Sequence, residues 1–263
     1  MKKLLAILLC LVMACSIFAG FAAEEAEGTL DAIKEKGTLV MLTNAEFVPY
    51  EYIGEGNAVA GIDVDICQAI ADALEVELEV VNMDFDGLIA ALSAGKGDLV
   101  AAGLTVTEER ALAVDFTNTY ADAKQLMIVN KDDPKVASEE ELDGKVVGVQ
   151  LGTTGDIYME QNFDSEVRPY KSGLDAALDL SNGRLDAVVI DELPAQSIVE
   201  ANDDLALVEM PNTADEQYAI AVKKGDASLL DALNEIIDQL IEEGKIAEFT
   251  AFHVEAVKGA EEE

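Results

Sequence analysis

Hydrophobic and polar positions follow two periodicities that alternate along the first half of the chain. Leu39–Leu42 is a short apolar run typical of a buried strand, and residues 63–75 repeat apolar side chains at helical spacing. Residues 76–80 alternate Val or Leu with Glu, which predicts a half-exposed strand. We expect a further helix capped by Asp86 and a strand at 98–102. The order β-α-β-α-β predicts parallel pairing with helices on the sheet faces.

A second run of the same kind begins near Gln125. The expected elements are strands at 145–149, 187–190 and 218–222, and helices at 155–161, 172–180 and 229–241. We expect residues 28–121 and 217–263 to form one lobe and residues 125–212 the other. The chain would then cross between the lobes twice, near 121–125 and 211–217, and two crossings permit a hinge motion.

One short pattern supports the division into two lobes. Leu92-Ser93-Ala94-Gly95-Lys96-Gly97-Asp98-Leu99-Val100 is matched 88 residues later by Leu180-Ser181-Asn182-Gly183-Arg184-Leu185-Asp186-Ala187-Val188. Each copy follows a helical stretch and leads into a short apolar strand. A spacing this long indicates two similar lobes, because stacked repeats have shorter periods. A cleft between two lobes is a common place for a small ligand.

Composition narrows the possible functions. The chain of 263 residues has 53 acidic and 17 basic residues, a formal net charge of −36. This charge argues against nucleic acid and against anionic lipid as partners. The chain has one histidine, His253, and Cys67 is the one cysteine beyond the N-terminal segment. Zinc sites and Ser-His-Asp triads therefore have little support, no cofactor is expected, and Cys67 is expected to be a buried structural thiol.

The N-terminus has the features of an export signal. A basic start, Met1-Lys2-Lys3, precedes an apolar run over residues 4–18 that is too short for a stable membrane span. Small residues follow, so we interpret residues 1–23 as a signal peptide cleaved near Ala22 or Ala23. A lipid-anchored form would need a cysteine after small residues, and Cys15 is a poor candidate because apolar residues continue beyond it. The protein is expected to be exported, either freely or with a lipid anchor.

Three predicted strand ends bear residues that could bind a ligand, because ligands of open α/β sheets bind beyond the carboxyl ends of the strands. After the strand at 98–102, Thr105 and Glu108 have the spacing of a capping box, and Arg110 follows. Free backbone N–H groups and an arginine would bind a carboxylate. The alternative is a surface arginine that balances neighbouring glutamates.

The other two strand ends belong to the second run. Gly152-Thr153-Thr154-Gly155 precedes a helix and could hold an anion, although ordinary turns use the same residues as caps. Asp191 follows an apolar strand and could pair with an ammonium group or cap the next helix. An α-amino acid has one carboxylate and one ammonium, so it would bridge the two lobes and favour their closed form.

Taken together, the motifs make the chain resemble the amino-acid family of extracellular solute-binding proteins of ABC importers. The segments that carry the resemblance cover essentially all of the chain after the signal: Asn44–Tyr52, Gly61–Asp65, Asp84–Leu88, Leu104–Arg110, Val114–Thr117, Gly152–Gly155 and Asp186–Asp191. The resemblance implies an α/β fold of the type II periplasmic-binding-protein kind. Each of its two lobes would be a mostly parallel sheet flanked by helices, and two hinge crossovers would join the lobes. It also implies a free L-amino acid as ligand, a cognate permease with its ATPase as partners, and a monomer.

The resemblance assigns roles to individual residues. Arg110 would hold the ligand carboxylate with help from the backbone and hydroxyl groups of Thr105 and Thr154, while Gly103 and Asp191 would meet the ammonium, and Thr153 is expected among the ligand-binding residues. Phe47 and Phe85 would sandwich the side chain, unless they are ordinary core residues. Asn44, Glu46 and Gln150 stand where residues that sort side chains tend to lie, and Glu46 could face a cationic group or solvent. Tyr50 and Thr117 are mild departures from the family pattern.

The resemblance leaves the substrate and one competing function open. The acidic chain favours a polar and cationic amino acid such as arginine, lysine or histidine, or else glutamine. Related folds include a cyclohexadienyl or arogenate dehydratase, so an enzyme is the alternative, because fold does not settle function. The scarcity of catalytic residue types favours binding over catalysis. A sensory module is a third possibility, but the chain shows no signalling domain.

Overall fold

The computed structural model describes residues 29–260, so the predicted signal peptide at residues 1–23 lies outside the described residues. The helices are α2 (Thr29–Lys36), α3 (Ile62–Leu74), α4 (Leu88–Ser93), α5 (Glu108–Ala113), α6 (Thr154–Asn162), α7 (Gly173–Ser181), α8 (Glu192–Glu200), α9 (Ala227–Glu242) and α10 (Lys245–Ala260). The strands of the first part are β1 (Thr38–Thr43), β2 (Glu46–Phe47), β3 (Glu51–Ile53), β4 (Val59–Ala60), β5 (Glu77–Asn82), β6 (Leu99–Val100), β7 (Val114–Phe116) and β8 (Ala121–Ala123). The remaining strands are β9 (Gln125–Asn130), β10 (Val146–Gln150), β11 (Glu166–Tyr170), β12 (Ala187–Asp191), β13 (Leu205–Glu209), β14 (Glu216–Tyr218) and β15 (Ala221–Lys223).

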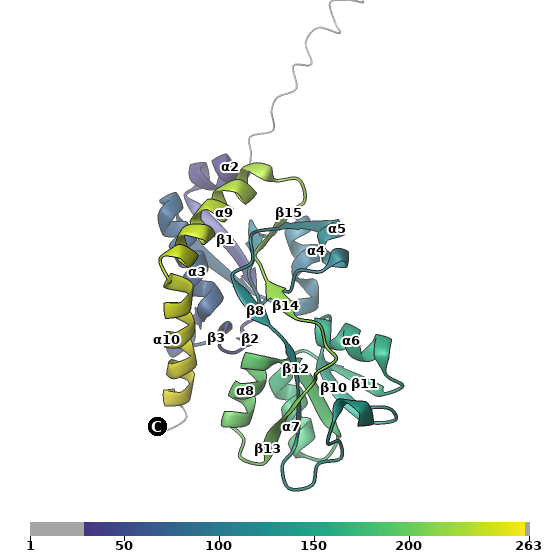
Figure 1. Ribbon diagram of the computed structural model, residues 1–263. Helices are drawn as coiled ribbons and strands as arrows, with labels where there is room; N and C mark the ends of the chain where they lie inside the picture. The colour runs from purple at the N-terminus through teal and green to yellow at the C-terminus, as the bar shows by residue number, and fades with distance from the viewer. Residues whose placement is uncertain (1–28, 261–263) are drawn as a thin grey trace, which may run out of the picture.

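Two five-stranded sheets form the cores of two lobes (Figure 1). Their strand orders are β5-β1-β6-β15-β7 and β11-β10-β12-β9-β13. In each sheet the first three strands are parallel and the fourth runs in the opposite direction, which returns the fifth to the direction of the first three. The mostly parallel sheets flanked by helices confirm the α/β prediction, and no helix among residues 29–260 is long and apolar enough to cross a membrane.

The two copies of the repeated pattern have the same place in the two lobes. The first leads from α4 into β6, and the second leads from α7 into β12. In the first copy, Asp98 accepts a hydrogen bond from the backbone N–H of Val40 at 2.8 Å. In the second copy, Asp186 accepts one from Val146 N–H at 2.9 Å. Each aspartate thus ties the start of one strand to the neighbouring strand, which is a scaffold role.

Two antiparallel strands connect the lobes. β8 pairs with β14, with Ala121 opposite Tyr218 and Ala123 opposite Glu216. These strands lie at the two crossings expected from the sequence, and Figure 1 shows them passing side by side between the upper and lower lobes. The C-terminal helix α10 runs down from the upper lobe, and its Lys258 forms an ion pair with Glu200 at the end of α8 (3.1 Å).

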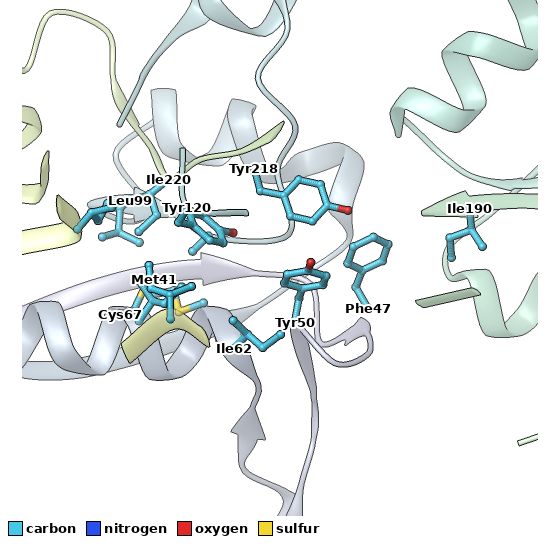
Figure 2. Close-up of a cluster of buried hydrophobic side chains, with 14 of the residues drawn as sticks. Met41, Phe47, Tyr50, Ile62, Cys67, Leu99, Tyr120, Ile190, Tyr218 and Ile220 are labelled. Atoms are coloured by element: carbon cyan, nitrogen blue, oxygen red, sulfur yellow. The ribbon is translucent and has the colours of Figure 1, made fainter. Parts of the chain in front are cut away.

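A cluster of buried side chains reaches from the first sheet to the cleft (Figure 2). Met41 and Leu99 lie deep in the lobe, and the rings of Tyr50, Tyr218 and Phe47 lie nearer the second lobe. The rings of Tyr50 and Tyr218 meet edge to face, with their centroids 5.0 Å apart. Packing of this kind fixes the rings that border the cleft.

Two local predictions were wrong. Asp86 does not cap a helix, because it lies inside a 3₁₀ turn at Phe85–Gly87 and α4 begins at Leu88 without a side-chain cap. The single strand expected over residues 218–222 is divided between β14 and β15, which pair with different partners. An apolar run of β-branched and aromatic residues cannot show by itself where a chain leaves one sheet for another.

Candidate functional site

A small pocket lies between the lobes at the carboxyl ends of their strands. It has an empty volume of about 210 Å³, openings included. Eight of the eleven residues that the sequence singled out line it: Phe47, Phe85, Gly103, Thr105, Arg110, Thr153, Thr154 and Asp191. We call this space the cleft pocket. Five of its residues precede the first crossing strand and three follow it, so both lobes contribute to its wall.

Arg110 is a buried guanidinium whose hydrogen bonds reach both lobes. Its Nη1 donates to the backbone carbonyl of Thr105 (2.8 Å), and its Nη2 donates to the carbonyl of Gly152 (3.1 Å). The side chain lies over the ring of Phe85, 5.5 Å from the ring centroid. None of the ion pairs formed within residues 29–260 includes Arg110. A buried cation that has only neutral acceptors among these residues is well suited to an anionic ligand.

The predicted capping box at Thr105 was wrong. Helix α5 begins at Glu108, and its cap is Thr107, whose hydroxyl accepts a hydrogen bond from Arg110 N–H at 3.1 Å. The hydroxyl of Thr105 instead donates to Glu216 at 2.7 Å. The cap thus lies two residues after the predicted position, and Thr105 lines the pocket instead of capping the helix.

The turn before α6 is a genuine helix start. Thr153 caps the helix by accepting a hydrogen bond from Asp156 N–H (3.3 Å), and its own hydroxyl donates to the Gln150 carbonyl (2.8 Å). Thr154 is the first helical residue, so helix geometry offers its backbone N–H no partner within the helix. The side chain of Thr153 therefore has the ordinary cap role, while Thr154 can present an N–H group to an anion.

Asp191 is a buried carboxylate at the end of β12. It stands at the start of α8 but makes no side-chain cap. Its Oδ1 accepts from Gln125 Nε2 at 2.8 Å, and its Oδ2 accepts from the Tyr218 hydroxyl. Burial and the nearby charge of Glu216 raise the pKa of Asp191 to about 7, against the opposing effects of these hydrogen bonds and of Arg110. The carboxylate is costly to ionise in the described structure, and a cationic group beside it would remove that cost.

Gly103 occupies the matching position at the end of the repeat in the first lobe. Its φ of +52° lies in the left-handed region, and a Cβ there would stand 2.6 Å from the ring of Phe47. Its N–H donates to the buried Asp63 at 2.8 Å, and Asp63 also accepts from the Tyr120 hydroxyl at 2.7 Å. Burial raises the pKa of Asp63 to about 6 despite these bonds. Gly103 is therefore held so that its backbone borders the pocket.

The two phenylalanines have different surroundings. Phe47 is buried, and its ring is stacked with Tyr50 at a centroid distance of 6.0 Å. Phe85 is half-buried beneath the guanidinium of Arg110. Both line the cleft pocket, and Phe47 also belongs to the core cluster of Figure 2. Phe47 is therefore both a core residue and a pocket residue.

Asn44, Glu46 and Gln150 lie outside the lining of the cleft pocket. Gln150 Nε2 donates to Asn44 Oδ1 at 2.9 Å, which joins the ends of β10 and β1 across the lobes. Gln150 Oε1 is buried and has no hydrogen-bond partner within residues 29–260. Glu46 is exposed and borders a separate open cavity of about 1940 Å³, openings included, between the β2–β4 sheet, α7, α8 and α10. Glu46 and Phe47 point to opposite faces of β2, as neighbours on a strand do.

Three residues around the site were not predicted from the sequence. Gln125, Glu216 and Tyr218 come from the two crossings, and they hold Asp191, Thr105 and Thr154 through side-chain hydrogen bonds. The signal was present, because polar residues on a strand that passes between lobes must lie next to the cleft. From the sequence, the two crossings are predicted only to act as hinges, so these three residues are not expected at the site.

Comparisons with known proteins agree with this architecture. Residues 39–254 match the family model of bacterial extracellular solute-binding proteins, family 3. The arginine-binding extracellular protein ArtP of Bacillus subtilis (strain 168) is 36% identical over 91% of this chain and 94% of its own length. The structure of holo ArgBP from T. maritima is 41% identical, with a TM-score of 0.76 over 80% of this chain and 93% of that one.

A third relative is a substrate-binding protein of an amino acid ABC transporter, AbpA from Streptococcus pneumoniae, whose structure is bound to L-arginine. It is 34% identical, with a TM-score of 0.82 over 86% of this chain and 98% of that one. The two-lobed arrangement is thus the type II periplasmic-binding-protein fold, as the sequence implied. The chain belongs to the bacterial extracellular solute-binding proteins, family 3.

Proposed function

We propose that this protein captures an L-amino acid with a cationic side chain, with arginine as the best ligand, and delivers it to an ABC permease and its ATPase. The proposed lobes are residues 28–121 with 217–263, and residues 125–212. A ligand that contacts both lobes would favour the closed form by its differential affinity.

The observation that carries the proposal is the pair of opposite charges in the cleft pocket. Arg110, from the first lobe, is buried without an acidic partner closer than 4.0 Å among residues 29–260, and Asp191, from the second, is buried with a raised pKa. The α-carboxylate would accept from Arg110 and from Thr154 N–H. The α-ammonium would donate to Asp191 and to the Gly103 carbonyl. A zwitterion therefore satisfies both groups at once.

Preference for arginine rests on the polar groups beyond this pair. Asn44 and Gln150 offer amide oxygens at the junction of the lobes, and the buried Gln150 Oε1 has an unused acceptor. A guanidinium presents five N–H donors, so it can fill such acceptors better than an ammonium or an amide. Phe47 and Phe85 would pack against the planar group. Three of the relatives compared above are named for arginine or contain it, which supports the same choice.

We further propose that the protein works outside the cytoplasmic membrane as a monomer and releases its ligand unchanged. The family description supports an extracellular role, and the compared relatives are binding proteins. A dehydratase would convert its ligand, so chromatography of a ligand recovered after long incubation distinguishes the two functions.

Calorimetry tests the proposal directly. The protein is unfolded, dialysed free of carried ligand, refolded and titrated with each of the twenty amino acids. We expect arginine to bind at least tenfold more tightly than glutamine, since one unpaired buried polar group costs about 1–3 kcal/mol. Binding of none of the twenty would contradict the proposal, and tight binding of acidic amino acids alone would contradict the charge argument.

A further inference from the structure

Glu216 links both lobes from the hinge strand β14. Its Oε2 accepts from the hydroxyls of Thr105 and Thr154, each at 2.7 Å, and its Oε1 accepts from Gln125 Nε2 at 2.9 Å. Thr105 belongs to the loop after β6, and Thr154 begins α6 in the other lobe. One carboxylate is thereby tied to both walls of the cleft pocket and, through Gln125, to the other hinge crossing.

Glu216 stands behind the pocket wall. Thr105 and Thr154 line the cleft pocket and also line a second, solvent-reachable cavity of about 1160 Å³. Glu216 and Gln125 line only the second cavity. The two threonines are therefore the partition between the spaces, and their hydroxyl protons point away from the cleft pocket toward Glu216.

The direction of these protons decides what the threonines can offer a ligand. A hydroxyl has one donor and two acceptor lone pairs. Thr154 Oγ1 accepts, at 3.2 Å, a share of the two N–H groups of Gln125 Nε2, which also donate to Asp191 and Glu216, whereas Thr105 Oγ1 only donates within residues 29–260. Thr105 thus keeps its acceptor capacity at the pocket. With the Gly103 carbonyl and Asp191, it completes three acceptors, which matches the three N–H groups of a primary ammonium.

We propose that Glu216 is a positioning residue for the ligand ammonium: by taking the Thr105 proton from behind the wall, it makes the Thr105 oxygen an acceptor. This inference rests on the proposed function, because it concerns the same pocket. Without the carboxylate, the Thr105 hydroxyl could turn its proton toward the ammonium, and a donor would then face a donor. The negative charge of Glu216 also adds to the attraction for a cation.

Glu216→Gln tests the proposal, with Glu160→Gln as a control that removes the same charge from an exposed position on α6. The amide can accept from one threonine but donates to the other, so we expect arginine affinity to fall about 10- to 100-fold, as for loss of a hydrogen bond to a charged group. The control should change affinity less than about twofold. Unchanged affinity in Glu216→Gln would overturn the proposal.

A double-mutant cycle distinguishes two roles of Glu216. It either orients the Thr105 hydroxyl or acts only as a brace that holds the two lobes together at the hinge. Thr105→Val removes the acceptor, so Glu216→Gln should then cost less than about threefold in that background. Full additivity of the two losses would show that Glu216 acts only as a brace and would overturn the proposal. Failure of the wild-type protein to bind any amino acid would instead contradict the proposed function, so the two failures are distinguishable.

The pH profile of binding is a second readout, and it tests the electrostatic effect of Glu216 on Asp191. Asp191 is faced by Arg110, by Glu216 and Tyr218 of β14, by Tyr50 and by its neighbour Glu192. Glu216 raises the pKa of Asp191, so Glu216→Gln should shift the loss of affinity on acidification to lower pH. An unchanged midpoint would contradict the electrostatic part of the proposal.

Discussion

In the first lobe Asp98 ties its strand to Val40, and in the second lobe Asp186 ties its strand to Val146, with nearly equal distances of 2.8 and 2.9 Å. Five residues after each aspartate the two lobes differ, because the first has Gly103 and the second has Asp191. The lobes thus agree where a strand must be fixed and differ where the strand ends meet the cleft. In each lobe, the start of the segment therefore fixes a strand, and the end of the same segment lies where a ligand would bind.

The two strand ends also place their carboxylates differently. In the first lobe Asp63 lies behind the chain and accepts from Gly103 N–H, so the backbone faces the pocket. In the second lobe the carboxylate of Asp191 itself lines the pocket, supported from behind by Gln125 and Tyr218. One lobe offers a guanidinium and a neutral backbone, and the other offers a negative charge. This asymmetry suits the two ends of an amino acid.

The largest effect is expected at Arg110, the cation of the first lobe. Arg110→Ala should weaken arginine binding about 100- to 1,000-fold, because truncating one side of a buried charge pair costs about 2–5 kcal/mol. Arg110→Lys should restore only part of this loss, since lysine lacks the paired donors of arginine. Calorimetry at pH 8 measures both variants. Wild-type affinity in Arg110→Ala would show that the carboxylate lies elsewhere.

Asp191→Asn should remove the negative charge that the second lobe contributes to the cleft pocket. We expect a loss of affinity of about 100-fold. The folded-state pKa of Asp191 is raised to about 7, so the ionised carboxylate destabilises the free protein as the pH rises through that value. The variant should therefore melt higher than wild type at pH 8, by a margin that shrinks as the pH falls toward the ordinary carboxyl pKa of 3.8. A lower melting temperature at pH 8 would contradict this account of the buried charge.

The same pKa predicts the pH dependence of wild-type binding. An ammonium beside Asp191 favours its ionised form, so the ligand-bound pKa lies below about 7. Affinity should be full above pH 7 and should fall as the pH decreases through that value, because Asp191 must then lose a proton to bind. Titrations from pH 5 to pH 9 measure this, and an affinity that rises on acidification would refute the assignment.

Gly103→Ala tests the neutral strand end. The left-handed backbone and the approach of Phe47 to 2.6 Å from a Cβ together predict a loss of about 2–3 kcal/mol of unfolding free energy, with weaker binding as the ring shifts. Chemical denaturation measures the change. Gly183→Ala is the matched control, because its φ is +70° but no atom lies within 4 Å of the added Cβ.

The smallest effects are expected where the lobes agree. Asp98→Ala and Asp186→Ala each leave a backbone N–H without its partner and should cost about 1–2 kcal/mol, with little change in affinity. The ion pair of Asp98 with the exposed Lys36 should add little. A large loss of binding in either variant would contradict the scaffold role of the repeat.

Sequence patterns predicted the parts of this molecule that depend on local periodicity. The apolar runs gave the strands of both sheets, and the repeat gave the two lobes. The cap at Thr107 was not predicted, because Thr105 has the capping-box spacing to Glu108 whereas Thr107 is followed by Arg110 at that position.

The rest of the site depends on contacts between distant segments. Asn44 and Gln150 meet because the lobes close on each other, and Glu46 faces away because β2 places Phe47 toward the pocket. Glu216 reaches Thr105 and Thr154 because β14 pairs with β8 and also forms a backbone bridge to Thr105 through Tyr218. No single segment encodes such contacts, so sequence reasoning located the ends of the strands better than the groups behind them.

The most direct test of the central claim combines two ligand analogues with two variants. Agmatine lacks the carboxylate of arginine, and argininic acid has a hydroxyl in place of the ammonium. We predict by calorimetry that Arg110→Ala weakens arginine far more than agmatine, and that Asp191→Asn weakens arginine far more than argininic acid. Equal losses for arginine and for the matching analogue would contradict the claim that the two strand ends recognise opposite ends of one amino acid.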